Sequence, residues 1–560
     1  MPSSSISTLG YFTRFLYNHN PFYLVSALLV LFGLHEALAD NNTLTGGWLL
    51  IGVLSGYTLL LVTAGYVIVR FGQVWEDARM ILLVTVLLFL ALTVSFDNLV
   101  LANPLLGAKF LLLGLAFSMA VSEGVFRSLR ICLPARYRLP YYLVLVLLFT
   151  YPYALAELSV RGQVVEMAWS VLAFPLVAAG VFLTLWPAVR TRGADEPANG
   201  TPWRWPWFPW PLFVFLLVAV CLRSYSISMA FEPYKGSMVG FQPYFLAPLV
   251  LVTALLILEA GIINHARGAQ AVGLLLPALA IWMCGAIHSP LNPLAQRNLS
   301  MLTDAAAAPL LLGVVTAGAF YVIAWWRGFR LGEFGLVGCL GLASVVGPST
   351  TSFSGLVAPQ AWPLALLALV ELPPGVWKRS SPRTAVGLAA AALAVSASGW
   401  MPNLNDHSRF VLLHGFGLLV LAIAALYDDR WARTLRRLAL PLIPVAALVA
   451  ATAYEFVFPE VPRAGQALYV AGLCAVAIWY WRRAPATAEL LAAMTTLAAL
   501  LILSLRGLYV GLKSSPLEKG LPWLAAGLGL LLLATVLSFA KGGLIVRGWR
   551  LLRWLSRSNV

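Results

Sequence analysis

The stretch 399–410 reads GWMPNLNDHSRF and gathers side chains that could do chemistry between two long apolar runs. Asp406, His407 and Arg409 are of the types that serve as orienting carboxylate, general base and anion clamp. This spacing predicts a polar pocket that faces outward from the membrane. The alternative interpretation is a solvated loop, because Asn, Asp and Ser favour turns.

A second polar connection, 288–304, reads HSPLNPLAQRNLSMLTD and carries His288 and Arg297. Both residues match the types found in 399–410, so they are added to the candidate catalytic set. The catalytic hypothesis requires the two connections to meet in space.

The third polar stretch, GPSTTSFSG at 347–355, interrupts an apolar run. Gly347 and Pro348 should stop a helix, and irregular backbone at membrane depth persists only where protein or a water-filled cavity satisfies it. One interpretation is a broken helix at a transport site, and the other is a span that ends near 347. The candidate solute-binding residues are Ser349, Thr350, Thr351, Ser352 and, on a separate apolar run, His414.

The composition determines which environment these stretches lie in. Hydrophobic residues make up 61% of the 560-residue chain and charged residues 11%, whereas a soluble domain has about 25% charged residues. Runs of about 20 apolar residues, the length needed to cross a bilayer, follow one another along the chain. We therefore expect an all-α, polytopic integral membrane protein with about 18 transmembrane helices. The expected spans are 21–38, 47–69, 80–96, 104–124, 139–158, 167–189, 206–224, 243–263, 269–287, 305–326, 334–357, 360–377, 384–400, 410–427, 438–457, 464–481, 487–508 and 521–540.

The basic residues predict how these spans are oriented. With the N-terminus in the cytoplasm, 27 of the 37 lysines and arginines fall on the cytoplasmic side. That bias agrees with the tendency of cytoplasmic loops to collect Lys and Arg. We expect both termini to be cytoplasmic in a cytoplasmic (inner) type of membrane.

The longest inside connection, 190–211, suggests how the chain is organised. We expect an N-terminal six-helix region at 1–189, a linker at 190–205, a twelve-helix region at 206–540 and a basic amphipathic tail at 541–560. The connection ends in tryptophans between prolines, which predicts either a lateral lipid-binding lip or an interfacial aromatic belt. These tryptophans are Trp203, Trp205, Trp207 and Trp210.

Charged residues inside the runs mostly lie near span ends, where long side chains can reach water. Arg223, Glu259 and Glu371 are interpreted in this way, and Glu123 is expected to pair with Arg127 four residues later. Asp428 and Asp429 are interpreted as a solvated helix end beside arginines.

The expected partners are membrane lipids, with anionic headgroups at the basic C-terminal tail. The positive charge is explained by membrane topology, so no nucleic acid is expected. The five cysteines are scattered without a CxxC pair, so neither a metal site nor a cofactor is expected. No internal repeat is evident in the sequence.

Three functions fit these features. The first is transport of a small or amphipathic solute near 347–355. The second is an enzyme acting at the outer face on a lipid-linked, glycan-type substrate, with the candidate catalytic set above. The third is a non-catalytic membrane subunit of a larger assembly, which the lack of standard catalytic motifs permits.

Overall fold

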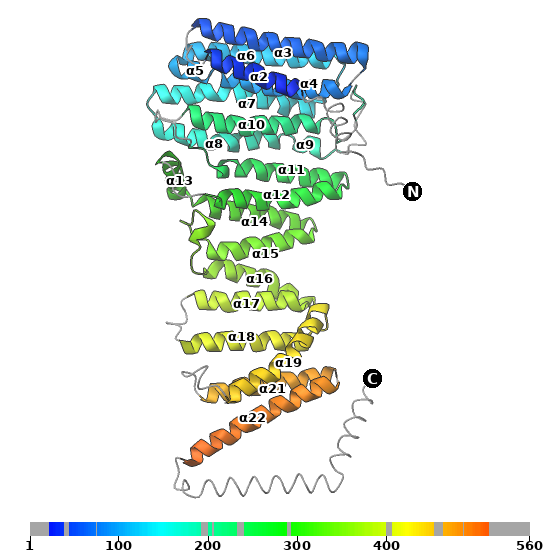
Figure 1. Ribbon diagram of the computed structural model, residues 1–560, viewed down its shortest axis with the longest axis vertical. Helices are drawn as coiled ribbons and strands as arrows, with labels where there is room; N and C mark the ends of the chain where they lie inside the picture. The colour runs from blue at the N-terminus through cyan, green and yellow to red at the C-terminus, as the bar shows by residue number, and fades with distance from the viewer. Residues whose placement is uncertain are drawn as a thin grey trace, which may run out of the picture. The chain divides into compact units, whose positions relative to one another are not determined.

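The computed structural model describes residues 22–38, 44–73, 75–191, 200–203, 206–231, 240–287, 293–398, 406–452, 463–484 and 486–513. Within these ranges the chain forms helices and turns, and no strand occurs (Figure 1). The chain forms two compact units, 1–357 and 358–560, and each is described by itself.

Unit 1 contains helices that run back and forth in succession. Their bounds are α2 (Phe22–Leu38), α3 (Leu44–Gly72), α4 (Trp75–Val94), α5 (Asp97–Ala102), α6 (Pro104–Ser128), α7 (Ala135–Val160), α8 (Val164–Leu183), α9 (Trp186–Val189), α10 (Trp210–Ala230), η2 (Pro243–Leu246), α11 (Ala247–Ile263), α12 (Arg267–Gly285), α13 (Pro293–Ala305), α14 (Pro309–Trp326), α15 (Arg330–Val345) and η3 (Phe353–Gly355). Helix α10 packs against α4, α7 and α8. The expected linker 190–205 therefore lies inside unit 1, and the division into regions on either side of it stays a prediction.

Unit 2 repeats this back-and-forth course. Its helices are α16 (Ala361–Trp377), α17 (Ser381–Ala397), α18 (Asp406–Leu426), α19 (Arg430–Thr452), α21 (Arg463–Arg483) and α22 (Thr487–Lys513). Helices α18, α19, α21 and α22 share one core of small side chains, mainly alanines. Small residues allow close approach of helices in a membrane, where the hydrophobic effect does not drive helices together.

The protein is a multi-pass integral membrane protein. Twelve of the described helices are long and apolar enough to cross a bilayer, and shorter apolar helices occur at Tyr23–Gly33, Ala361–Trp377 and His414–Leu426. Every expected span contains a helix except 521–540, which lies outside the described residues, as does the basic tail 541–560. The total of eighteen spans and the orientation of the termini stay predictions.

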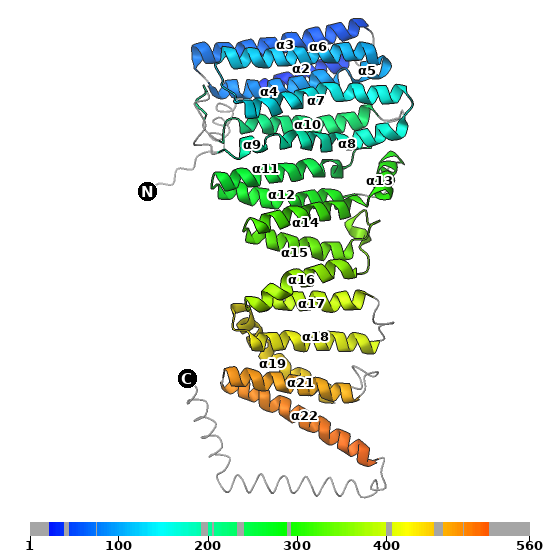
Figure 2. The same cartoon turned by 180° about the vertical axis from the view of Figure 1, so that it is seen from behind.

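The two ends of unit 1 carry different connections between helices. The α13 end carries the connections 95–103, 161–163 and 286–308, which follow helices α4, α7 and α12 (Figure 1). The opposite end, called the α9 end, carries the described connections 129–134, 184–191, 206–209, 264–266 and 327–329, with arginines in or beside most of them; the view from behind in Figure 2 shows the same separation. Under the predicted orientation, the α9 end is cytoplasmic and the α13 end is external.

One expected span differs from the structure. The run 334–357 was expected to be one span, but helix α15 ends at Val345 and α16 begins at Ala361. Gly347 and Pro348 follow the helix end, and Pro348 lacks the N–H that would continue helical hydrogen bonding. The stretch 347–355 is therefore a connection between helices rather than a break within one helix.

Two helical hairpins share the same turn. His265 joins α11 to α12 with φ 53°, and Arg379 joins α16 to α17 with φ 50°. The residue after each donates its N–H to the carbonyl of Gly261 or Gly375, at 2.9 and 2.8 Å. The two turns therefore close their helices in the same way.

The same two hairpins pack through equivalent glycines. A Cβ added at Gly273 would lie 2.8 Å from the backbone N of Leu258, and one at Gly387 would lie 2.7 Å from that of Leu372. Only glycine permits so close an approach of two helix backbones.

The two hairpins also have identical residues at a few corresponding positions. Residues 271–274 and 385–388 both read AVGL, and 278–280 and 392–394 both read ALA. The offset is the same as that between the paired glycines and between the paired turn residues. The same closing turn also occurs after α6 at Arg130 and after α14 at Gly328, so it does not by itself mark a repeat, and the expectation of no evident internal repeat stays a prediction.

Candidate functional site

An apolar groove of about 470 Å³ lies in unit 1 towards the α13 end. It lies among α8, η2, α11, α12, α13 and α14. Its lining residues are Trp169, Leu172, Ala173, Leu176, Tyr244, Phe245, Ala247, Pro248, Leu251, Cys284, Leu302, Pro309, Leu312, Gly313 and Thr316. A volume of about 300–1,000 Å³ is typical of small-molecule sites, so the groove has room for a ligand.

The short helix η2 places an aromatic wall on this groove. It begins at Pro243, whose fixed φ suits a first helical position. Tyr244 and Phe245 follow, with ring centroids 4.9 Å apart, and Phe241 stacks edge-on to Phe245 at 5.4 Å. Tyr244 and Phe245 are buried and Phe241 is half-buried, and together their contacts hold the Tyr244 ring at the groove wall.

The polar groups of the groove are few. The Tyr244 side chain is 5% exposed, and its hydroxyl finds no hydrogen-bond partner among the residues that the structure describes. Thr316 instead donates its hydroxyl to the carbonyl of Leu312, at 2.7 Å. A buried polar group without a partner costs free energy, so the Tyr244 hydroxyl is suited to bond a ligand.

Helix α13 was not expected from the sequence, which predicted a loop over 288–304. Its buried face consists of Leu294, Ala295, Asn298 and Leu299, and Leu302 on the next turn lines the groove. The predicted catalytic residue Arg297 lies half-buried on this helix. The signal was an apolar residue every three or four positions, which the polar residues between them obscured.

The remaining predicted catalytic residues are only partly described. His288 lies outside the described residues. Asp406, His407 and Arg409 belong to the first turn of α18, but their side chains also lie outside the description. Arg297 belongs to unit 1 and α18 to unit 2, so the grouping of all five side chains stays a prediction.

The predicted solute-binding residues of 347–355 lie in the connection after α15. Thr350 is buried, and its hydroxyl accepts the N–H of Gly347 at 2.9 Å, so it closes the turn. Ser352 pairs with Ser354 at 2.8 Å, whereas Ser349 is exposed and Thr351 is half-buried. The binding role of these residues stays a prediction.

This connection nevertheless contacts the groove region. The Phe353 ring covers the end of α12, since a Cβ added at Gly285 would lie 2.3 Å from it. Gly285 directly follows the groove-lining Cys284. The stretch 347–355 therefore packs against the end of α12, one residue beyond the groove lining.

His414, the last predicted binding residue, lies in unit 2. Its ring packs edge-on to Tyr469 of α21, with centroids 4.7 Å apart. This aromatic contact joins α18 to α21, which is a structural use of the side chain.

The sequence interpretation missed a buried ion pair. Arg223 was expected to reach water from its span end, but its side chain is fully buried on α10. It pairs with Asp97, the first residue of α5, and an Arg223 nitrogen also donates to the hydroxyl of Ser226 at 3.1 Å. The only sequence signal was an aspartate, in SFDNLV, between two apolar runs.

Two carboxylates near the α9 end are held by arginines. Glu259 is also buried rather than solvated, with Arg190 at 3.6 Å and Arg327 at 3.3 Å. The expected pair of Glu123 with Arg127 is present at 3.6 Å, and Arg138 and Tyr142 donate to the same carboxylate. These contacts tie neighbouring helices and show no arrangement for catalysis.

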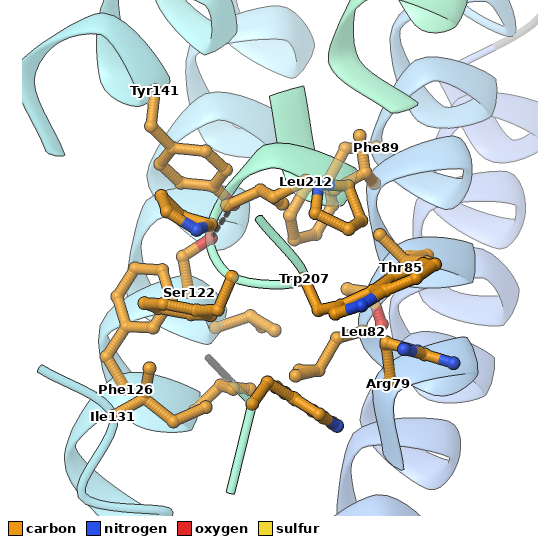
Figure 3. A pocket seen from close by; sticks show the side chains of 18 residues that line it. Arg79, Leu82, Thr85, Phe89, Ser122, Phe126, Ile131, Tyr141, Trp207 and Leu212 are labelled. Atoms are coloured by element: carbon orange, nitrogen blue, oxygen red, sulfur yellow. Dashed lines mark hydrogen bonds between the residues drawn. The ribbon is translucent and has the colours of Figure 1, made fainter. Parts of the chain in front are cut away.

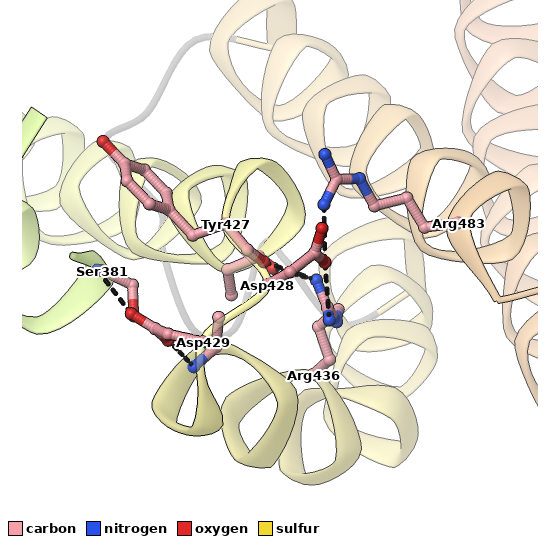
Figure 4. Close-up of polar contacts among 8 residues, drawn as sticks. Ser381, Tyr427, Asp428, Asp429, Arg436 and Arg483 are labelled. Atoms are coloured by element: carbon pink, nitrogen blue, oxygen red, sulfur yellow. Dashed lines mark hydrogen bonds and ion pairs between the residues drawn. The ribbon is translucent and has the colours of Figure 1, made fainter. Parts of the chain in front are cut away.

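Unit 2 has its own polar cluster at the ends of α17 and α18 (Figure 4). Asp429 accepts the hydroxyl and the N–H of Ser381 at 2.6 and 2.7 Å, and also the N–H of Ala432 at 2.7 Å, as a helix cap for α19. Asp428 pairs with Arg436 at 3.3 Å and Arg483 at 2.7 Å. The two aspartates were expected beside Arg430 and Arg433, but their side chains bind residues of α17, α19 and α21.

Burial and hydrogen bonding act in opposite directions on Asp429. Burial raises the pKa of the carboxyl, but hydrogen bonds from Ser381 and Ala432, with Arg436 nearby, outweigh it. The pKa of Asp429 therefore lies below its ordinary value.

In the part of the chain that the structure describes, no group of three or more His, Cys, Asp or Glu is arranged to hold a metal ion. No family model matches the chain, and neither a curated protein nor a solved structure matches it.

Proposed function

We propose that the protein transports an amphipathic solute whose apolar chain lies in the groove among α8, η2 and α11–α14. The observation that carries this proposal is the groove itself, which encloses about 470 Å³ between almost entirely apolar side chains. A charged or strongly polar solute would lose its hydration there without compensation. An apolar chain loses no favourable hydration when it enters the groove.

The side chains that line the groove are suited to binding a solute rather than to catalysis. Trp169, Tyr244, Cys284 and Thr316 are its hydrogen-bonding side chains, and they provide no pair of general acid and base. The Tyr244 hydroxyl supplies one directional contact for the polar part of the solute. The hairpins α11–α12 and α16–α17, which share a turn and a close glycine contact, support the same proposal, because many transporters are built from repeats.

The proposal is tested by a substitution that fills the groove with a larger side chain. Ala173 lines it from α8, whereas Val177, one turn later, is 42% exposed and does not line it. Ala173→Phe and Val177→Phe add bulk to the same helix, so the second is the matched control. Purified variants in liposomes would be assayed with a fluorescent single-chain phospholipid, whose passage between leaflets is read by a membrane-impermeant quencher.

We expect Ala173→Phe to lower probe passage by about tenfold or more, equivalent to ~1.4 kcal/mol, with Val177→Phe close to wild type. Equal rates in all three proteins would show that the groove is not the path. Wild-type protein that binds the probe but never moves it would contradict transport.

An enzyme acting at the outer face is the second candidate. It is favoured by one observation: helix α13 supplies both the predicted catalytic Arg297 and the groove-lining Leu302. A lipid-linked substrate with its chain in the groove would have its polar part near this helix. Replacing His288 and Arg297 together should then cause a modified lipid to disappear from extracts, while binding of the chain persists.

A further inference from the structure

A second cavity lies at the opposite end of unit 1, near the α9 end. It is a narrow slot between α4, α6, the start of α7 and the segment 206–212 (Figure 3). The slot encloses about 70 Å³, room for a few water-sized groups and so for part of one hydrocarbon chain. Its walls are mainly apolar, with Leu82, Phe126, Ile131 and Leu212 among them.

The polar groups inside the slot already bond to the protein. The hydroxyls of Ser122 and Tyr141 bond each other at 2.7 Å. Thr85 donates its hydroxyl to the carbonyl of Ile81, at 2.8 Å. The interior therefore offers little to a polar ligand, and it favours an apolar one.

The edge of the slot carries a cationic side chain beside two aromatic rings. The Arg79 guanidinium lies 5.9 Å from the ring centroid of Trp203 and 5.8 Å from that of Trp207. Figure 3 shows Arg79 and Trp207 together at one side of the slot. Tryptophan favours the headgroup level of a membrane, and its ring face attracts the cation and holds it in place.

We propose that this slot binds an anionic phospholipid, with part of one acyl chain between α4 and α6 and the phosphate on Arg79. Charge and position support this occupant. The connections of the α9 end are rich in arginine, so an anionic headgroup is attracted to this end of the unit. The site is separate from the groove and is independent of what the groove carries.

Glu76 is the internal competitor for Arg79. Its carboxylate lies 2.7 Å from the guanidinium, but the Glu76 side chain is 54% exposed. Exposed ion pairs contribute little stability, and a guanidinium has five donors, so a phosphate can displace this partner or share the guanidinium with it. The variant Glu76→Gln, which removes the competing carboxylate, should therefore bind the phosphate more tightly.

The experiment uses native mass spectrometry on the full-length protein with added phosphatidylglycerol or phosphatidylcholine of identical chains. The variants are Arg79→Gln, Trp207→Ala and Glu76→Gln, and the matched control is Arg161→Gln. Arg161 also pairs with a glutamate four residues earlier, at 2.9 Å from Glu157, but lies at the α13 end. Trp207 is 63% exposed, so its removal should leave the fold intact.

We expect phosphatidylglycerol binding to fall about tenfold in Arg79→Gln, to fall in Trp207→Ala and to rise in Glu76→Gln. Arg161→Gln should match wild type, and phosphatidylcholine should bind weakly to all. Wild-type binding in both Arg79→Gln and Trp207→Ala would overturn the proposal. Equal loss in Arg161→Gln, which indicates diffuse charge, or equal binding of the two lipids would also overturn it.

Discussion

The guanidinium of Arg223 donates to both carboxylate oxygens of Asp97, at 2.5 and 2.7 Å, although 126 positions separate the two residues in sequence. Arg223 is 0% exposed and Asp97 3% exposed. Each charge has lost its hydration, and each is compensated chiefly by the other. The pair therefore fixes the α4–α5 corner against α10.

Removing one partner should leave an uncompensated buried charge. We expect Asp97→Asn and Arg223→Gln each to destabilise the fold by about 3–5 kcal/mol. Thermal unfolding in detergent would measure the effect. The double variant Asp97→Leu/Arg223→Met, which removes both charges, should be more stable than either single variant; a double variant as unstable as the sum of the singles would contradict the pairing.

Asp429 should make unit 2 sensitive to acid. Its pKa lies below the ordinary 3.8, so the carboxylate stabilises the folded state fully above that value. This stabilisation is lost as the pH falls from the ordinary pKa through the lower folded pKa. The stability difference between wild type and Asp429→Asn should therefore shrink below about pH 4, as unfolding curves recorded across that range would show.

Asp428→Asn is the control for this pH effect. The Asp428 side chain is 73% exposed, so its ion pairs should contribute little stability. If the stability difference between wild type and Asp429→Asn is the same at every pH, titration of the Asp429 carboxylate is excluded as its cause.

Two tyrosines offer a test of the groove without any change of bulk. The Tyr244 hydroxyl lacks a partner among the described residues, whereas the Tyr321 hydroxyl donates to the carbonyl of Leu274 at 2.9 Å. Tyr244→Phe should leave stability unchanged or raise it, while weakening solute binding. Tyr321→Phe should lower stability by about 0.5–1.5 kcal/mol. Thermal unfolding with and without the single-chain lipid separates these effects, and the reverse pattern would remove Tyr244 from the site.

Cys132 provides a test of orientation. It is exposed in the connection between α6 and α7 at the α9 end. We expect a membrane-impermeant maleimide to label it in intact cells only after permeabilisation, because this end is predicted to be cytoplasmic. Gln163→Cys in a Cys132→Ser background lies in the exposed connection between α7 and α8 and should label without permeabilisation. Labelling with the opposite pattern would reverse the topology.

The sequence predicted what depends on local pattern. Apolar runs placed a helix in every described expected span, since span length is set by bilayer thickness. The end of α15 followed from Gly347 and Pro348, one of the two interpretations left open. These features need no knowledge of distant residues.

The features that the sequence did not predict depend on contacts between distant segments. The sequence alone did not reveal the partner of Arg223, because Asp97 lies 126 positions away along the chain. The groove required helices α8 to α14 to be placed together, and its key residue Tyr244 resembles any interfacial tyrosine in sequence. Helix α13 was missed because its apolar positions are few and separated by polar ones.

The matching hairpins α11–α12 and α16–α17 have a consequence for how such a chain can lengthen. A two-helix unit returns the chain to the side of the membrane from which it started. Inserting, copying or deleting a whole unit therefore leaves every later connection facing its original compartment, whereas a change of one helix would invert all of them. Growth in pairs would allow a long membrane chain to change its length without redistributing its arginines.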